Sequence, residues 1–172
     1  MDSMKTTYLL TGANLGDRLA TLQEAKRLIG EKIGLVKAAS SHYETEAWGV
    51  ADQPPYINQA LEVLTPLEPE QVLAMIWEIE TALGREPRKK WGSRLIDIDV
   101  LFYEDLILNT DTLTLPHPHL HRRNFVLVPM LQIAPEKMHP LLQKTIEELY
   151  EATEDTLDVI LLETFATEIQ TG

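Results

Sequence analysis

The order of the expected secondary-structure elements is the strongest constraint on how this chain can fold. In chain order, hydrophobic periodicity and turn residues predict a strand at 6–11, a helix at 17–29, extended segments at 35–45 and 56–64, a helix at 69–83 and a strand at 95–101. Elements that alternate as β-α-β-β-α-β favour an antiparallel sheet with helices packed on a face. The expected class is therefore α+β.

Both helices have residues that are typical of helix ends. Asp17 or Asn14 can cap the first helix, and Gly30 is expected to end it. Pro69 suits the first turn of the second helix, and Gly84 is expected to end that helix.

The sequence beyond residue 101 predicts fewer elements. A rigid turn at 115–118 is expected before a helix near 119–133, and a helix at 145–152 and an edge strand at 157–162 follow. No interdomain linker interrupts the 172 residues, so we expect the whole chain to form a single catalytic domain.

Composition argues against several classes of protein. The chain has no cysteine, which removes disulfides and thiolate metal sites. It has no apolar run long enough to cross a membrane and no signal peptide, so we expect a cytoplasmic protein. Its net charge of −12 argues against nucleic acid and membranes as partners. A monomer is the simplest expectation.

The basic residues are concentrated in one region. Residues 85–123 hold seven of the 15 Lys and Arg against six acids, whereas the rest of the chain holds eight bases against 21 acids. A locally basic region in an acidic protein fits a compact anionic ligand such as a nucleotide. A solvated charged loop is the alternative for residues 85–90 taken alone.

Two carboxylates share one face of the predicted strand at 95–101. Asp97 and Asp99 alternate with branched apolar residues, so the aspartates face one side of the sheet and the apolar side chains face the other. Oxygen ligands next to a phosphate-binding region favour Mg²⁺, and two ions could share such a pair. A buried network of these aspartates with Arg94 is the alternative.

Other catalytic patterns are missing or weak. The sequence has no P-loop, no G-x-G-x-x-G after a strand and no H-E-x-x-H. His117, His119 and His121 lie in and after a proline-rich turn, where their side chains would splay, so a zinc site is not favoured.

An aromatic and a carboxamide side chain share one face of the extended segment that begins at residue 56. Tyr56 can stack on a flat heterocycle, and Asn58 can hydrogen-bond to its edge. Phe125, close to Arg123, is a second candidate for stacking. A purely structural role for Tyr56 in the core is the alternative.

Several motifs occur together and in a fixed order. The most specific is Lys90-x-Gly92-Ser93-Arg94-x-x-Asp97-Ile98-Asp99-Val100-Leu101. The others are Gly12-x-Asn14-Leu15-Gly16-Asp17-Arg18, Asp52-Gln53-Pro54-x-Tyr56-x-Asn58, Glu80-x-x-x-Gly84-Arg85, Pro116-His117 and Arg123-x-Phe125-Val126-Leu127. This set resembles the 6-hydroxymethyl-7,8-dihydropterin pyrophosphokinase family of folate biosynthesis. The resemblance covers about residues 5–136 and leaves 137–172 as an acidic extension without an assigned function.

The resemblance implies a ferredoxin-like fold, ATP as co-substrate, two Mg²⁺ ions, and transfer of an intact pyrophosphoryl group to the pterin hydroxymethyl oxygen with release of AMP. It also implies roles for individual residues. The catalytic residues would be Arg85, Arg94, Asp97 and Asp99, of which the two aspartates would hold the metal. The pterin-binding residues would be Thr45, Tyr56, Asn58, Trp91 and Phe125. The ATP-binding residues would be Glu80, Arg88, Arg94, His117 and Arg123.

The chain departs from the family pattern at a few positions. The family often has two prolines where this chain has Glu46-Ala47-Trp48-Gly49, and Trp77 or Thr112 stands at a Gln or basic position that contacts ATP. Any base of 88–90 could be the second phosphate-binding base. Two other functions remain as alternatives, namely another Mg²⁺-dependent nucleotide pyrophosphohydrolase and a non-catalytic pterin- or nucleotide-binding relative.

Overall fold

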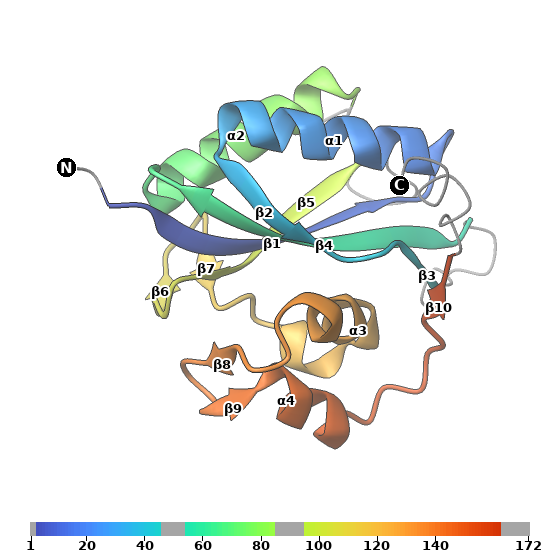
Figure 1. Cartoon of the computed structure of the whole chain (residues 1–172), viewed down its shortest axis with the longest axis vertical. Coiled ribbons are helices and arrows are strands. Elements are labelled where there is room, and N and C mark those ends of the chain that lie inside the picture. Colours follow the sequence, from blue (N-terminus) through green and yellow to red (C-terminus); the bar gives the residue numbers. More distant parts are fainter. Residues whose placement is uncertain (1–2, 46–53, 85–94, 163–172) are drawn as a thin grey trace.

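The computed structural model describes residues 3–45, 54–84 and 95–162. Within these ranges, the centre of the protein is an antiparallel sheet of six strands (Figure 1). The strands are β1 (Lys5–Ala13), β2 (Leu35–Ala39), β3 (Tyr43–Thr45), β4 (Tyr56–Thr65), β5 (Asp97–Tyr103) and β10 (Ile160–Leu161). Their order is β10-β3-β4-β1-β5, and β2 also pairs with β4. The predicted antiparallel sheet is therefore confirmed, with β1 and β4 at its centre.

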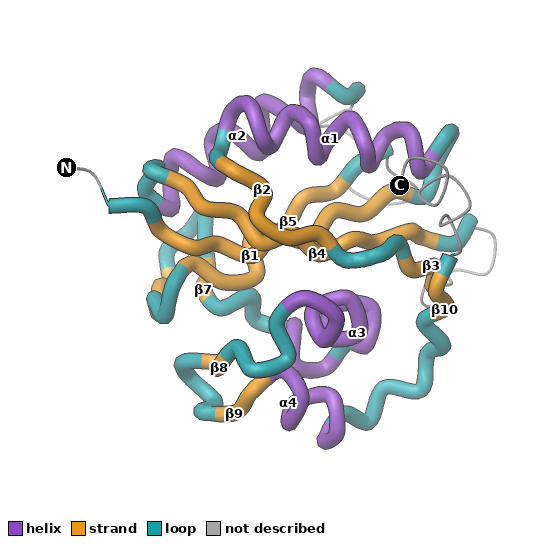
Figure 2. Tube along the Cα trace, viewed as in Figure 1, coloured by secondary structure: helices purple, strands orange, loops and turns teal. Residues whose placement is uncertain are grey.

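The two predicted helices cover one face of this sheet (Figures 1 and 2). They are α1 (Arg18–Lys32) and α2 (Pro69–Ala82). Asp17 caps α1 by accepting a hydrogen bond from the Ala20 N–H (3.1 Å), and Gly84, with a φ of 97°, follows the end of α2; both predictions are confirmed. The core beneath the helices contains Leu9, Leu22, Ile29, Ile76, Ile79, Ile98 and Val100.

The predicted end of α1 at Gly30 is wrong. The hydrogen bonds of the helix continue past this residue, and the Ile33 N–H still donates to the carbonyl of Ile29 (2.9 Å). The chain instead turns at Gly34, where a Cβ would collide with the carbonyl oxygen of Leu64 on β4. A contact with a distant strand therefore decides which glycine makes the turn.

The extended segment predicted at 35–45 is two strands, β2 and β3, which pair with successive parts of β4. Ser40 lies between them. Its N–H donates to the carbonyl of Ala60, and its Oγ accepts from the Ala60 N–H, both at 2.9 Å. The serine side chain thus continues the pairing with β4 across the break.

Two more helices, α3 (Asn124–Ile133) and α4 (Ile146–Ala152), cover the opposite face of the sheet (Figures 1 and 2). The helix expected near 119–133 is divided, because Arg123 is extended (φ −130°, ψ 115°) between the short 3-10 helix η1 (Leu120–Arg122) and α3. The remaining strands form two small hairpins, β6 (Leu108–Asn109) with β7 (Thr114–Leu115) and β8 (Met138–His139) with β9 (Lys144–Thr145). None of the helices in the described ranges is long and apolar enough to span a membrane.

The alternation predicted for β5 holds as far as Leu101 and then slips. Leu101 packs against α3, on the face of the sheet that carries Asp97 and Asp99, but Phe102 packs into the same cluster. The register explains this, because Tyr8 pairs with Phe102 while the next residue, Leu9, pairs with Val100. Leu101 is therefore the extra residue of a β-bulge.

Candidate active site

The register of the sheet brings Asn58 on β4 and Asp97 on β5 into one row, on either side of β1. Gly12 on β1 pairs with Asn58 on β4 and with Asp97 on β5. Two residues along, Leu10 on β1 pairs with Asp99. Both aspartates therefore reach the sheet face that α3 covers, next to the amide of Asn58.

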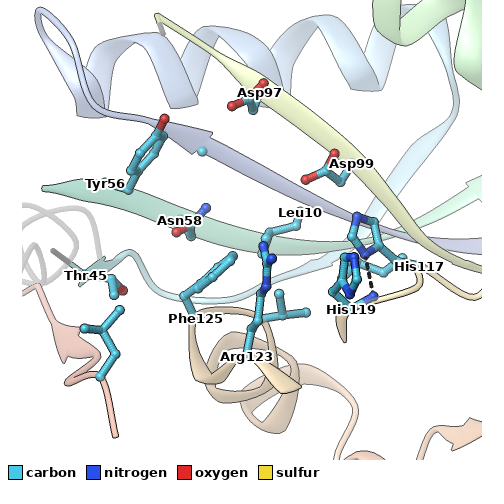
Figure 3. A pocket seen from close by; sticks show the side chains of 14 residues that line it. Leu10, Thr45, Tyr56, Asn58, Asp97, Asp99, His117, His119, Arg123 and Phe125 are labelled. Carbon is cyan, nitrogen blue, oxygen red and sulfur yellow. Dashed lines mark hydrogen bonds between the residues drawn. The ribbon is translucent and has the colours of Figure 1, made fainter. Parts of the chain in front are cut away.

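The other wall of this site comes from α3 and the residue before it. Phe125 and Arg123 extend from α3 and the residue before it toward the sheet, and Tyr56 and Asn58 on β4 line the same space (Figure 3). The guanidinium carbon of Arg123 lies 5.6 Å from the centre of the Phe125 ring. Such a stack holds an aromatic face and a positive charge side by side.

These side chains enclose a cavity of about 290 Å³, which we call the first cavity. Its lining residues are Leu10, Gly12, Thr45, Tyr56, Asn58, Asp97, Asp99, Leu101, His117, His119, Arg123, Phe125, Val126 and Leu157. The buried Oγ1 of Thr45 has no hydrogen-bond partner among the described residues. A small apolar cavity with a few polar groups is typical of a binding site for a small molecule.

A second cavity, of about 340 Å³, lies against β5 and α2. It is lined by Leu73, Trp77, Glu80, Asp97, Ile98, Asp99, Val100, Thr112, Leu113, Thr114, His117 and Pro118. Asp97, Asp99 and His117 line both cavities. The aspartate pair therefore stands where two cavities adjoin, so that molecules bound in them would meet at these carboxylates.

A buried carboxylate fixes the strand that carries the two aspartates. Glu80 on α2 is 3% exposed, and its Oε2 accepts a hydrogen bond from the Ile98 N–H at 2.8 Å. Ile98 lies between Asp97 and Asp99 in the sequence. The backbone between the two aspartates is therefore tied to α2. Loss of the Glu80 carboxylate would leave the buried N–H of Ile98 without its acceptor.

His117 is held neutral in the wall between the cavities. Burial lowers its pKa to about 4, and the positive charge of Arg123 and the neighbouring His119 act in the same direction. Its Nδ1 accepts a hydrogen bond from the His119 N–H (3.3 Å; Figure 3). A neutral imidazole carries one proton, so Nε2 bears it and can donate to an anion.

Two residues of the first glycine-rich motif hold the chain as it enters β4. The Asn14 side chain donates to the carbonyl of Pro54 (3.2 Å), and Arg18 donates to the carbonyl of Pro55 (2.9 Å). Arg18 also pairs with Glu44 on β3 (2.7 Å). From the sequence, Asn14 was expected only as an alternative cap of the first helix, and Arg18 had no expected role, although both lie in the glycine-rich motif that follows the first strand.

The two carboxylates fit a magnesium site whose remaining oxygen ligands come from water and a bound phosphate. Asp97 and Asp99 supply two carboxylates on one strand. Within the described ranges, no group of three or more His, Cys, Asp or Glu side chains is placed to hold a metal. Mg²⁺ is usually held by one or two carboxylates together with waters and phosphate oxygens, which is the arrangement that two aspartates can support.

The structure brings together most of the residues that the sequence singled out. The first cavity is lined by Thr45, Tyr56, Asn58, Asp97, Asp99, His117, Arg123 and Phe125, and the second by Glu80. Arg85, Arg88, Trp91 and Arg94 lie outside the described residues, as does the segment from Glu46 to Gly49. Several other lining residues had no site role in the sequence-based predictions, and Leu157 is the one among them that lies in the C-terminal extension. The roles of all these residues stay predictions.

Fold and site together place the chain among α+β enzymes that act on small molecules, with a carboxylate pair between two cavities. The chain belongs to the 7,8-dihydro-6-hydroxymethylpterin-pyrophosphokinase (HPPK) family, whose model matches residues 8–135. The family and the ferredoxin-like fold that the sequence predicted are thereby confirmed.

Relatives of this chain come from several bacteria. The 2-amino-4-hydroxy-6-hydroxymethyldihydropteridine pyrophosphokinase of Aquifex aeolicus is 39% identical over 145 residues, which are 84% of this chain and 90% of that protein. The enzyme of the same name from Bacillus subtilis is 37% identical over 127 residues, 73% of this chain and 76% of that one. The bifunctional protein FolKE of Lactococcus lactis is 41% identical over 161 residues, but they make up only 46% of its length.

Solved structures of HPPK-DHPS proteins share the fold. One, in complex with substrates, superimposes with a TM-score of 0.72 at 15% identity and 87% coverage of this chain. The wild-type protein of Plasmodium falciparum with pteroate gives a TM-score of 0.71 at 18% identity and 88% coverage. The chain spans 43% and 42% of those two chains, so the likeness concerns one part of each.

Proposed function

We propose that this chain transfers the pyrophosphoryl group of ATP to the hydroxymethyl oxygen of 6-hydroxymethyl-7,8-dihydropterin and releases AMP, as a step of folate biosynthesis. The family match over residues 8–135 supports this activity. The observation that carries the assignment to particular residues is that Asp97, Asp99 and His117 line both cavities. Two substrates bound on either side of these residues would have their reacting ends next to each other.

The pterin is assigned to the first cavity. Tyr56 and Phe125 offer aromatic faces on which a flat heterocycle can stack. The amide of Asn58 is held by a hydrogen bond from Nδ2 to the carbonyl of Thr11 (3.2 Å) and offers polar contacts to the edge of the ring. Oγ1 of Thr45, which has no hydrogen-bond partner among the described residues, offers another. The hydroxymethyl group would then point toward Asp97.

ATP is assigned to the second cavity, with its phosphates toward the aspartate pair. Trp77 and Leu113 supply apolar surface for the adenine ring. His117 can donate from Nε2 to a phosphate oxygen without a proton being taken up, because its low pKa keeps the ring neutral. The guanidinium of Arg123 can pair with the same phosphates from the side of the first cavity.

Asp97 and Asp99 would hold two Mg²⁺ ions. When bound, Mg²⁺ neutralises the charge of the phosphate oxygens and lowers the pKa of an attached hydroxyl. The residues of this chain would orient the hydroxymethyl oxygen for in-line attack on the β-phosphorus. The new bond joins that oxygen to the β-phosphorus, and the hydroxyl proton passes to water. The bond from the β-phosphorus to the oxygen that bridges it to the α-phosphorus breaks, and AMP leaves with that oxygen. Positioning supplies much of the acceleration in reactions of this kind.

Four residues outside the described ranges complete the proposal by resemblance to the family. Arg85, Arg88 and Arg94 are assigned to the phosphates and Trp91 to the pterin, as the sequence motifs imply. Five bases lie within residues 85–94, which supports a phosphate-binding function for this segment.

Product identity tests the proposal. The purified chain is incubated with ATP, Mg²⁺ and reduced 6-hydroxymethylpterin, and AMP, ADP and free pyrophosphate are resolved. We expect AMP that forms only when pterin is present, together with pterin diphosphate and without free pyrophosphate. Pterin-independent AMP and pyrophosphate would identify a hydrolase instead, and pterin binding without turnover would identify a non-catalytic relative.

A further inference from the structure

The segment from Thr153 to Leu162, which we call the C-terminal strap, lies beyond residues 8–135 that the family model matches. It leaves the end of α4 beneath the sheet and runs to β10, which lies beside β3 (Figure 1). The strap therefore connects the α3 and α4 layer with the edge of the sheet. These are the two layers between which the first cavity lies.

One carboxylate in the strap holds the beginning of α3. Asp155 Oδ2 accepts a hydrogen bond from the Asn124 N–H (2.8 Å), and Oδ1 accepts from the Leu157 N–H (3.0 Å). The Asn124 side chain also donates to the Asp155 carbonyl (3.1 Å). The local N-cap, Arg123, makes no side-chain cap bond, so Asp155 serves as the cap of α3 from a distant part of the chain.

The far end of the strap is fixed to β3. Ile160 and Leu161 pair with Glu44 and Tyr43, and the Leu162 N–H donates to the carbonyl of His42 (2.9 Å). β3 ends at Thr45, which lines the first cavity. The strap is thus anchored at both sides of that cavity, to α3 at one end and to β3 at the other.

Between the two anchors, Leu157 lines the first cavity. We infer that the strap is a wall of the pterin pocket, in which Leu157 contacts the flat ring of the substrate and Asp155 is a positioning residue for Phe125 and Leu157. This inference rests on the proposed function, because it names further residues of the same pocket. It gives the acidic extension a role in substrate binding that no sequence motif indicated.

Substitution of Leu157 by alanine tests the contact between this side chain and the pterin ring directly. Leu157→Ala removes part of the apolar surface that the ring would cover, so we expect the Kd for the reduced pterin to rise roughly 5- to 20-fold. The KM for ATP should stay within twofold of the wild type. Leu141→Ala is the matched control, because Leu141 lies on the same C-terminal part of the chain, is 62% exposed and is absent from the cavity lining. An unchanged pterin Kd in Leu157→Ala would overturn the inference.

Asp155→Asn tests the positioning role. An amide has only one acceptor oxygen, so one of the two N–H bonds made by the carboxylate is lost. We expect faster hydrogen exchange at Asn124 or Leu157, and roughly a tenfold fall in kcat/KM for pterin with a smaller change of kcat at saturation. Asp158→Asn, at an exposed aspartate of the strap, is the control. Faster exchange with normal pterin kinetics would mean that the bonds serve folding only.

The wild type is measured in the same series, so that two kinds of failure can be told apart. Wild-type turnover with an unaffected Leu157→Ala contradicts the strap inference and leaves the proposed function intact. A wild type that binds pterin but makes no product contradicts the proposed function, and the comparison of pterin Kd values still decides the inference. A wild type that binds no pterin overturns both.

Discussion

Asn58 and Asp97 lie two strands apart in the sheet, yet a single residue, Gly12, pairs with both. A Cβ at position 12 would lie 2.5 Å from Nδ2 of Asn58, which is closer than nonbonded atoms approach. The absence of a side chain on Gly12 therefore allows the amide of Asn58 to lie where it lines the first cavity.

Gly12→Ala should weaken pterin binding more than it weakens the fold. The atom that the new methyl group meets is the end of a side chain, which can rotate away, so we expect a loss of about 1–2 kcal/mol of stability. The displaced amide would no longer meet the ring edge, and the Kd for pterin should rise about tenfold, as measured by calorimetry.

Gly30→Ala is the matched control for this substitution. Among the described residues, a Cβ at Gly30 meets nothing within 4 Å, and Gly30 lies inside α1. We expect a gain of about 0.4–1 kcal/mol in stability with unchanged pterin affinity. Equal pterin affinity in Gly12→Ala and Gly30→Ala would contradict the role given to Asn58.

Removing either carboxylate of the pair should abolish most turnover. We expect Asp97→Ala and Asp99→Ala each to lower kcat by about 100-fold or more, because each removes a proposed metal ligand. Titration with Mg²⁺ should show a higher requirement in the variants, and chelation of Mg²⁺ should stop the wild type. Asp105→Ala, at an 81% exposed carboxylate after β5, is the control. Near-normal kcat in either variant would rule out a two-metal site on these residues.

Glu80 should matter through the hydrogen bond that its carboxylate accepts. Glu80→Ala leaves the buried Ile98 N–H without its acceptor, so we expect the free energy of unfolding to fall by about 1–3 kcal/mol. Glu80→Gln keeps an acceptor oxygen and should lose less. Urea unfolding measures both, with Glu78→Ala on the exposed side of α2 for comparison. Equal losses in the alanine and glutamine variants would show that this bond does not stabilise the strand.

The buried imidazole of His117 should make the fold sensitive to acid. Its pKa is 6.5 in the unfolded chain and about 4 in the folded protein, so the unfolded state binds more protons between these values and stability falls as the pH falls. Between pH 7.5 and pH 5 we expect His117 to account for a loss of about 2 kcal/mol.

His117→Gln isolates this effect. Burial also lowers the pKa of His121 and of His139, so the variant should keep part of the pH dependence and lose the part due to His117. Urea unfolding of both proteins at the two pH values gives the difference. If the free energy of unfolding changes equally with pH in the variant and the wild type, His117 is already protonated at pH 5 in the folded protein as well as in the unfolded chain.

Local sequence patterns predicted the features that depend on neighbouring residues. The alternation around Asp97 and Asp99 defined one face of β5, and the cap at Asp17 and the glycine after α2 defined helix ends. These features need only the pleat of a strand or the geometry of a helix end.

Features that depend on a distant partner could not be predicted in this way. The bulge at Leu101 exists because of the register with β1, and the turn at Gly34 exists because of the close approach of β4. Leu157 lines the cavity from a segment that is held by the hydrogen bond between Asp155 and Asn124 and by the pairing of β10 with β3. No periodicity in the local sequence encodes such long-range pairings.

The pairing of β10 with β3 also bears on solubility. β10 is the last strand in the order of the sheet, so it covers N–H and C=O groups of β3 that would otherwise form an open edge. An uncovered edge is a template on which another chain can add a strand and aggregate. Substitutions that release the strap should therefore lower the affinity for the substrate and also the highest concentration at which the protein stays monodisperse. Inhibitors that fill the first cavity and contact Leu157 should counteract the self-association of the protein.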